Sequence, residues 1–163
     1  MILRRRSQSM IGERLGEHTD FGSVTILFNR LGGLQVLLPG EGTEWCYVRP
    51  LAGHAIVNLG DAMVKFTNGL LRSNIHRVVS PPGEQAGETR YSLVYFARPE
   101  DDVVLKRLES PVIPPLAEGD EEEEINAKDW IIRRALKKRV GNFKEEEWER
   151  NQWTERISAR SRI

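Results

Sequence analysis

Two residues near the start of the chain have the types and the spacing to bind a metal ion. His18 and Asp20 stand two positions apart, just before the apolar run 23–28. Side chains two positions apart on an extended strand point to the same face, so an imidazole nitrogen and a carboxylate oxygen would be aimed together. Such donors suit a first-row divalent metal, and two histidines with one carboxylate leave open coordination positions, as in non-haem Fe(II) centres. A second histidine must therefore come from elsewhere in the chain.

The chain has three histidines, and the second ligand is expected to be His76 or His54. His76 lies in "NIHRVV", which reads as a strand, whereas His54 lies in the turn "LAGHA", where exposure to solvent is expected. The pattern favours His76, but spacing alone does not decide between the two. A pair such as His18 and Asp20 also occurs often without any metal.

A second pair, Arg90 and Ser92, repeats the two-residue spacing inside the apolar strand "TRYSLVYF". A guanidinium that points into a core needs an anion. The forked donors of Arg90 match a carboxylate in a bidentate manner, and the Ser92 hydroxyl would add a hydrogen bond. A small dicarboxylate ligand would fit this pair. The alternative is an Arg90 at a sheet edge that reaches water.

The elements that must position these side chains are predicted to be short strands. Residues 1–98 show apolar runs broken by Gly, Pro and Asn, a rhythm typical of a sandwich or barrel. The predicted strands cover 23–28, 34–38, 45–50, 55–60, 73–80 and 89–99, and 62–69 reads as a short strand or a helical turn. Because residues 89–99 are apolar on both faces, we expect this strand to be central and buried. Gly60-Asp61 reads as a turn.

Beyond residue 100 the composition changes, and the chain is divided into a core (1–108), an acidic Pro-containing linker (109–125) and a helical C-terminal segment (126–163). Asn126 is expected to cap the helix, with Asp129 completing a capping box. One face of that helix carries the apolar side chains, and Gly141 is expected to end it. These apolar residues are Trp130, Ile131, Ala135 and Leu136. The basic cluster 133–139 is interpreted as the solvated face of a docked amphipathic helix, in preference to a nucleic-acid site.

The length and composition of the chain favour a single soluble domain. The chain has 163 residues, 39% of them apolar, with a formal net charge of zero. A chain of this length can form one soluble domain with a core. Its zero net charge provides no overall electrostatic attraction for nucleic acid or an anionic membrane. No apolar run approaches the ~20 residues that span a bilayer. Cys46 is the sole cysteine and is expected to be buried; with no signal peptide evident, the composition favours the cytoplasm.

Four segments of the sequence together resemble a known family. "HTDFGSVTILF", "GGLQVLL", "IVNLGDAMVKFTNGLLRSNIHRVVSPP" and "RYSLVYFARP" are similar to the catalytic core of the iron(II)/2-oxoglutarate-dependent dioxygenases, isopenicillin N synthase-like group. The likeness runs from about residue 14 to residue 105. It implies a mainly β double-stranded β-helix (jelly roll), incomplete at the N-terminus, with a C-terminal helical tail.

The resemblance also implies a set of roles and an activity. His18, Asp20 and His76 would hold Fe(II), and Arg90 with Ser92 would hold the far carboxylate of 2-oxoglutarate. The expected reaction is hydroxylation or desaturation of a small organic molecule by dioxygen, with 2-oxoglutarate decarboxylated to succinate and ascorbate as a reductant, in secondary metabolism.

Two other readings stay open. Only seventeen residues precede His18, and family members carry further strands and helices there. A truncated, catalytically incompetent jelly-roll remnant or a metal-binding interaction module is therefore the alternative. A cupin-like enzyme that uses a metal without an oxo-acid is the third reading, and the Arg90-x-Ser92 pair argues against it.

Overall fold

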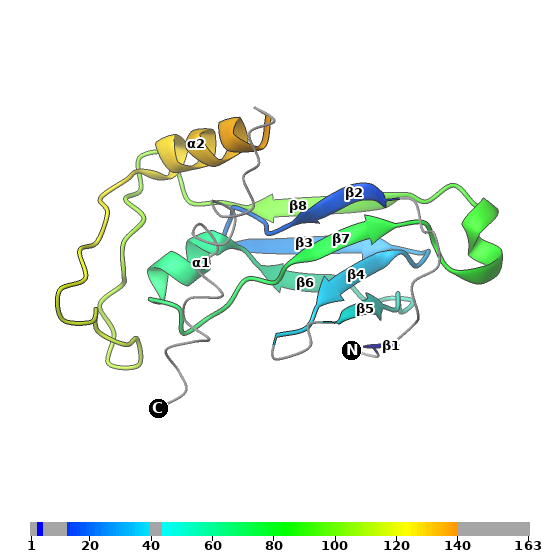
Figure 1. Cartoon of the computed structure of the whole chain (residues 1–163), viewed down its shortest axis with the longest axis horizontal. Coiled ribbons are helices and arrows are strands. Elements are labelled where there is room, and N and C mark those ends of the chain that lie inside the picture. The colour runs from blue at the N-terminus through cyan, green and yellow to red at the C-terminus, as the bar shows by residue number, and fades with distance from the viewer. Residues whose placement is uncertain (1–2, 5–12, 40–43, 140–163) are drawn as a thin grey trace. The chain divides into compact units, whose positions relative to one another are not determined.

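The computed structural model of the chain describes residues 3–4, 13–39 and 44–139. Its strands are β1 (Leu3–Arg4), β2 (Glu13–His18), β3 (Val24–Asn29), β4 (Leu34–Leu37), β5 (Trp45–Val48), β6 (Ile56–Leu59), β7 (His76–Val79) and β8 (Ser92–Ala97). Two α-helices, α1 (Asp61–Phe66) and α2 (Ala127–Arg139), and one 3-10 helix, η1 (Gly83–Gly87), complete the described elements (Figure 1).

The strands form two sheets, in the orders β1-β5-β4-β7-β2 and β6-β3-β8. From β2 onward the chain passes repeatedly from one sheet to the other, so most strands pair with strands distant in sequence. β7, for example, lies antiparallel between β2 and β4. This is the jelly-roll arrangement, and the fold predicted from the sequence is confirmed.

The chain divides into two compact units. The first comprises the described parts of 1–19, 25–58 and 74–96 and holds nearly all of both sheets. The second comprises 20–24, 59–73 and the described part of 97–163, and it holds both α-helices. Its core is a cluster of fully or nearly fully buried apolar side chains: Ala62, Leu105, Ala127 and Trp130. The predicted division into a core, a linker and a helical tail stays a prediction.

The strand signals in the sequence locate β3 to β7 to within a few residues. The segment left as a strand or a helical turn is the helix α1, which is followed by Asn68 and Gly69, both with positive φ (45° and 80°). These two residue types adopt the left-handed conformation most readily, so the Asn-Gly pair provides the turn out of α1. Cys46 is buried, as expected.

The prediction that residues 89–99 form a central, buried strand was wrong. Among the described residues β8 is the last strand of its sheet. Its side chains are largely exposed, with Leu93 at 71% and Tyr95 at 63%, and the neighbouring Tyr91 at 80%. A strand that is apolar on both faces is suited to burial on both sides. Whether it is buried depends on which other segments pack against it.

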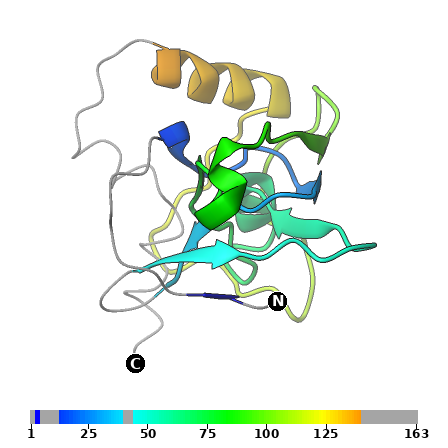
Figure 2. The same ribbon diagram turned by 90° about the vertical axis from the view of Figure 1, so that its right-hand side faces the viewer.

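The predicted cap of the C-terminal helix is confirmed. The Asp129 amide donates to Asn126 Oδ1, and Asn126 Nδ2 donates to Asp129 Oδ2, both at 2.8 Å. From there α2 runs as an unbroken helix in both views (Figure 2). Trp130 is buried, but Leu136 is 54% exposed, so the predicted apolar face is narrower than expected. The proposed stop at Gly141 lies outside the described residues.

Neither α1 nor α2 combines the length and the apolar character that a membrane-crossing helix needs.

Candidate metal centre

Two histidines lie opposite each other on neighbouring strands of the five-stranded sheet. His18 ends β2, His76 begins β7, and the antiparallel register pairs them directly. Directly paired residues lie on the same face of a sheet, so the two rings are adjacent, with centroids 4.3 Å apart. The topology thus selects His76 as the partner of His18. His54 lies in an exposed turn, as the sequence predicts.

The hydrogen bonds of the two rings determine which nitrogen is available. His18 Nδ1 lies 2.8 Å from the Gly16 carbonyl oxygen, and His76 Nδ1 lies 3.1 Å from that of Asn74. A carbonyl oxygen only accepts, so Nδ1 must be the donor in each case. Each ring therefore keeps its Nε2 lone pair for a ligand, and the backbone fixes the ring orientation, as is usual for metal-binding histidines.

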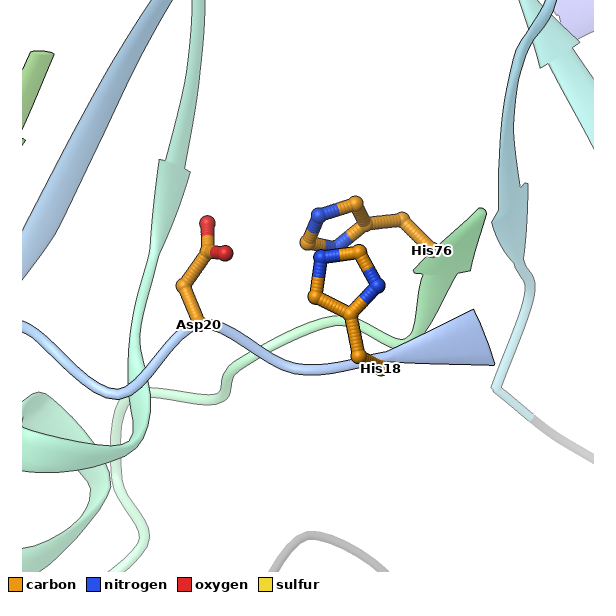
Figure 3. Close-up of side chains that lie close together, drawn as sticks. All are labelled: His18, Asp20 and His76. Atoms are coloured by element: carbon orange, nitrogen blue, oxygen red, sulfur yellow. The ribbon is translucent and has the colours of Figure 1, made fainter. Parts of the chain in front are cut away.

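The carboxylate of Asp20 completes the group. One donor atom from each of His18, Asp20 and His76 lies within 4.8 Å of the others. In Figure 3 the Asp20 and His18 side chains extend to the same side of the segment that joins them, and the His76 ring reaches toward both from β7. Asp20 is 7% exposed. Two imidazole nitrogens and one carboxylate oxygen at this separation are a donor set that fits Fe(II) or a similar divalent ion.

Asp20 reaches this position from a loop, which the sequence pattern did not indicate. β2 ends at His18, and the next two residues are outside any strand. The convergence of the two side chains therefore does not come from strand alternation. The loop is instead held to the start of α1, where the Asp61 amide donates to the Asp20 carbonyl oxygen at 2.8 Å.

Two glycines permit this close approach of backbones. A Cβ on Gly60 would lie 2.2 Å from the carbonyl oxygen of Gly22 and 2.9 Å from that of Asp20. A Cβ on Gly22 would lie 2.5 Å from the Ala97 carbonyl oxygen. No side chain fits at these separations, so glycine is required at position 60 for the loop to lie against the start of α1, and at position 22 for it to lie against Ala97, the last residue of β8. The sequence marked Gly60 only as a turn.

Arg90 and Ser92 lie together, just before and at the start of β8. Arg90 is half-buried, its Nε donates to the Gly32 carbonyl oxygen at 2.9 Å, and its Nη1 lies 3.4 Å from Ser92 Oγ. The two side chains lie together, as expected, but the prediction that both belong to the strand was wrong for Arg90, because β8 begins only at Ser92. Their role toward a ligand stays a prediction.

Sequence reasoning missed Asp61 as a residue of the site's surroundings. The sequence predicts only a turn at this position, but the Asp61 carboxylate accepts hydrogen bonds from Ser73 Oγ, at 2.5 Å, and from Arg134 on α2. An acidic residue directly after a glycine at a helix start was the available signal. Its partners, 12 and 73 positions away, follow only from the tertiary structure.

A family model described as the 2OG-Fe(II) oxygenase superfamily matches residues 6–99, more than half of the chain. The chain belongs to this superfamily. The resemblance inferred from the sequence motifs is thereby confirmed. The His-Asp-His group described above lies within the matched residues.

Fungal oxygenases of the superfamily are similar to this chain in sequence. A 2-oxoglutarate-dependent dioxygenase of Glarea lozoyensis is 45% identical over 97 residues, which cover 60% of this chain and 28% of that protein. Another from Aspergillus fumigatus is 44% identical over 115 residues, with 61% and 30% covered. The chain thus spans less than a third of the length of these curated relatives.

Solved structures share the fold. A Neurospora crassa protein solved in complex with alpha-KG and thymine matches with a TM-score of 0.66 and 32% identity, over 77% of this chain and 38% of that one. A structure described as a 2OG-Fe(II) oxygenase family protein from Caulobacter crescentus matches with a TM-score of 0.62, also at 32% identity, over 76% of this chain and 40% of that one.

Proposed function

We propose that this oxygenase chain uses Fe(II) and 2-oxoglutarate to oxidise a small organic molecule, by hydroxylation or desaturation, with 2-oxoglutarate decarboxylated to succinate. The observation that carries the proposal is the convergence of His18, Asp20 and His76 within 4.8 Å, in a chain of this superfamily. Fe(II), when bound by these three residues, supplies the redox chemistry with dioxygen.

In this proposal the chain's own residues bind the metal ion and 2-oxoglutarate and fix their orientation. The Nε2 atoms of His18 and His76 and the carboxylate of Asp20 would hold the ion, and the backbone carbonyls behind each Nδ1 keep the rings in place. In this proposal Arg90 and Ser92 bind the distal carboxylate of 2-oxoglutarate, the guanidinium through two N–H groups and the serine through its hydroxyl. The bond from Arg90 Nε to Gly32 would limit the freedom of the guanidinium.

Ligand binding tests the proposal before any substrate is known. Anaerobic protein is mixed with Fe(II) and 2-oxoglutarate, and the weak visible charge-transfer band of the chelated oxo-acid is recorded. We expect a band in the wild-type chain, none in Asp20→Ala, and at least roughly a tenfold weaker apparent affinity for 2-oxoglutarate in Arg90→Ala, since a charge-assisted bidentate pair is lost.

A matched control comes from the other end of β8. Arg98 follows the strand directly and is exposed, so Arg98→Ala removes the same guanidinium without touching the proposed ligand pair. Equal loss of 2-oxoglutarate binding in Arg98→Ala and Arg90→Ala would contradict the assignment of Arg90. Binding of Fe(II) without any 2-oxoglutarate would instead support the alternative, a catalytically incompetent jelly-roll remnant or a metal-binding module.

The finer parts of the proposal are the reductant, the location and the metabolic setting. Ascorbate would restore iron oxidised in unproductive turnovers, so its omission should lower the number of turnovers before inactivation. A cytoplasmic location is supported by the single, unbridged cysteine, Cys46, and is tested by cell fractionation. Secondary metabolism is proposed as the setting, and a screen of fungal small molecules for succinate release would test it.

A further inference from the structure

The ion pair that Arg134 of α2 makes with Asp61 is more enclosed than the one that the neighbouring Arg133 makes with Glu123. Arg134 Nη2 donates to Asp61 Oδ2, and the two side chains are only 21% and 13% exposed. The preceding residue, Arg133, pairs with Glu123, but there the side chains are 43% and 52% exposed. Arg134 therefore points inward, although the sequence placed the whole basic cluster 133–139 on the solvated face.

Asp61 pairs with Arg134 through its carboxylate, and its backbone also hydrogen-bonds to the backbone of Asp20, a proposed metal ligand. Its amide donates to the Asp20 carbonyl oxygen at 2.8 Å. The amides on either side continue this contact: Gly60 donates to the Ser23 carbonyl oxygen at 3.0 Å, and Ala62 donates to that of Gly22 at 3.2 Å. Three successive amides at the start of α1 thus fasten the loop that carries Asp20.

Arg134 contacts the same loop a second time, through Phe21. Its guanidinium carbon lies 5.0 Å from the ring centroid of Phe21 and 5.0 Å from that of Trp130. The two rings meet edge to face, with centroids 6.4 Å apart. A guanidinium over two aromatic rings is held by cation–π attraction and by packing. Phe21 also packs against the buried cluster that contains Trp130.

We propose that Arg134 is a positioning residue for Asp20. It acts through the Asp61 carboxylate, whose backbone amide holds the residue-20 carbonyl, and through Phe21, the next residue along. A carboxylate on a loop fastened at both points loses less conformational freedom when it binds a metal ion, so affinity is higher. This inference deepens the proposed function, since it concerns the same metal site, and its test includes one measurement that needs no metal.

The first measurement is metal affinity. Arg134→Gln and its matched control Arg133→Gln each remove one guanidinium from α2, and each protein is titrated with Mn²⁺ while the signal of the free ion is followed by electron paramagnetic resonance. We expect the Kd for Mn²⁺ to rise about tenfold in Arg134→Gln, the lower end of the range for residues behind a metal ligand. It should stay unchanged in Arg133→Gln. Equal affinities in the two variants would overturn the proposal.

A further variant separates positioning from simple loss of helix packing. Ile131 lies on α2 and packs against the core cluster of Ala62, Leu105, Ala127 and Trp130, and its hydrocarbon side chain has no group that could donate to the Asp61 carboxylate. Ile131→Ala should lower the urea midpoint of unfolding while leaving the Kd for Mn²⁺ within about twofold of wild type. If Ile131→Ala weakens Mn²⁺ binding as much as Arg134→Gln does, Arg134 acts only by docking the helix, and the proposal fails.

Amide hydrogen exchange gives the readout that is independent of metal. The Asp61 and Ala62 amides should exchange faster in Arg134→Gln than in wild type, and at the wild-type rate in Arg133→Gln. If the wild-type chain binds no Mn²⁺, the proposed metal site is wrong, yet this exchange still decides whether Arg134 fastens the loop. Unchanged exchange at Asp61 in Arg134→Gln would overturn the positioning role on its own.

Discussion

His18 and His76 stand directly opposite each other in the register of β2 and β7, with ring centroids 4.3 Å apart. Each ring gives its Nδ1 proton to a carbonyl oxygen two residues earlier in its own strand segment. Both therefore present Nε2, next to the buried carboxylate of Asp20. The geometry provides three donors and leaves the remaining positions on an ion for other ligands.

Removal of one of the two facing rings should abolish tight metal binding. His76→Ala leaves one imidazole and one carboxylate, and we expect the Kd for Co²⁺, followed by its visible absorption, to rise by about a hundredfold or more because a direct ligand is lost. His54→Ala is the matched control, because His54 makes the same Nδ1 contact to a carbonyl two residues earlier but lies in an exposed turn. Loss of Co²⁺ binding in His54→Ala would contradict the assignment.

A side chain at Gly60 should separate the loop from α1. In Gly60→Ala the new Cβ would overlap the Gly22 carbonyl oxygen, which is backbone and cannot rotate away. We expect a loss of about 3 kcal/mol in the free energy of unfolding in urea, the upper range for overpacking. Gly87→Ala is the control, since a Cβ there meets nothing within 4 Å; equal effects of the two substitutions would show that the contact does not matter.

The exposed strand β8 should tolerate truncation of its apolar side chains. Leu93 is 71% exposed and Leu105 fully buried, so the same substitution can be compared at both positions. Leu105→Ala should reduce the free energy of unfolding by about 3 kcal/mol, whereas Leu93→Ala should change it by less than about 0.5 kcal/mol. A large loss of stability in Leu93→Ala would mean that another segment or another copy covers β8 in solution.

The ion pair on the outer side of α2 predicts a small dependence of stability on pH. The hydrogen bond from Arg133 lowers the pKa of Glu123 below its ordinary value, aided by the charge of Arg133 and opposed by partial burial. The folded state therefore favours the ionised form, so the stabilisation is present above the ordinary glutamate pKa and is lost as the pH falls through the lowered one. Both side chains are about half exposed to solvent (43% and 52%), which screens the pair, so its contribution is at most about 1 kcal/mol.

Urea midpoints of wild type and Glu123→Gln, measured from neutral pH down into the acid range, test this dependence. The two curves should differ most at neutral pH and converge as the pH falls. A gap that widens toward acid would reverse the sign and refute the pairing as its cause.

Sequence patterns predicted those features of the structure that depend on residues only a few positions apart. Arg90 and Ser92, only two residues apart, lie together as predicted, although Arg90 precedes β8. The Asn126 cap depends on atoms only three residues apart, and it formed as expected. Runs of β-branched and apolar residues located β3 to β7, since these residues suit a pleated, half-buried surface.

The sequence by itself determined the donor types, the position of most strands and the membership of the superfamily through its motifs. Only the tertiary structure decided which histidine faces His18, that Asp20 acts from a loop fastened to α1, that β8 is exposed, and that Arg134 turns inward to Asp61. The physical reason is the range of the interactions. Backbone alternation and capping act over a few residues, whereas strand pairing, cover and buried ion pairs join residues that only the completed topology brings together.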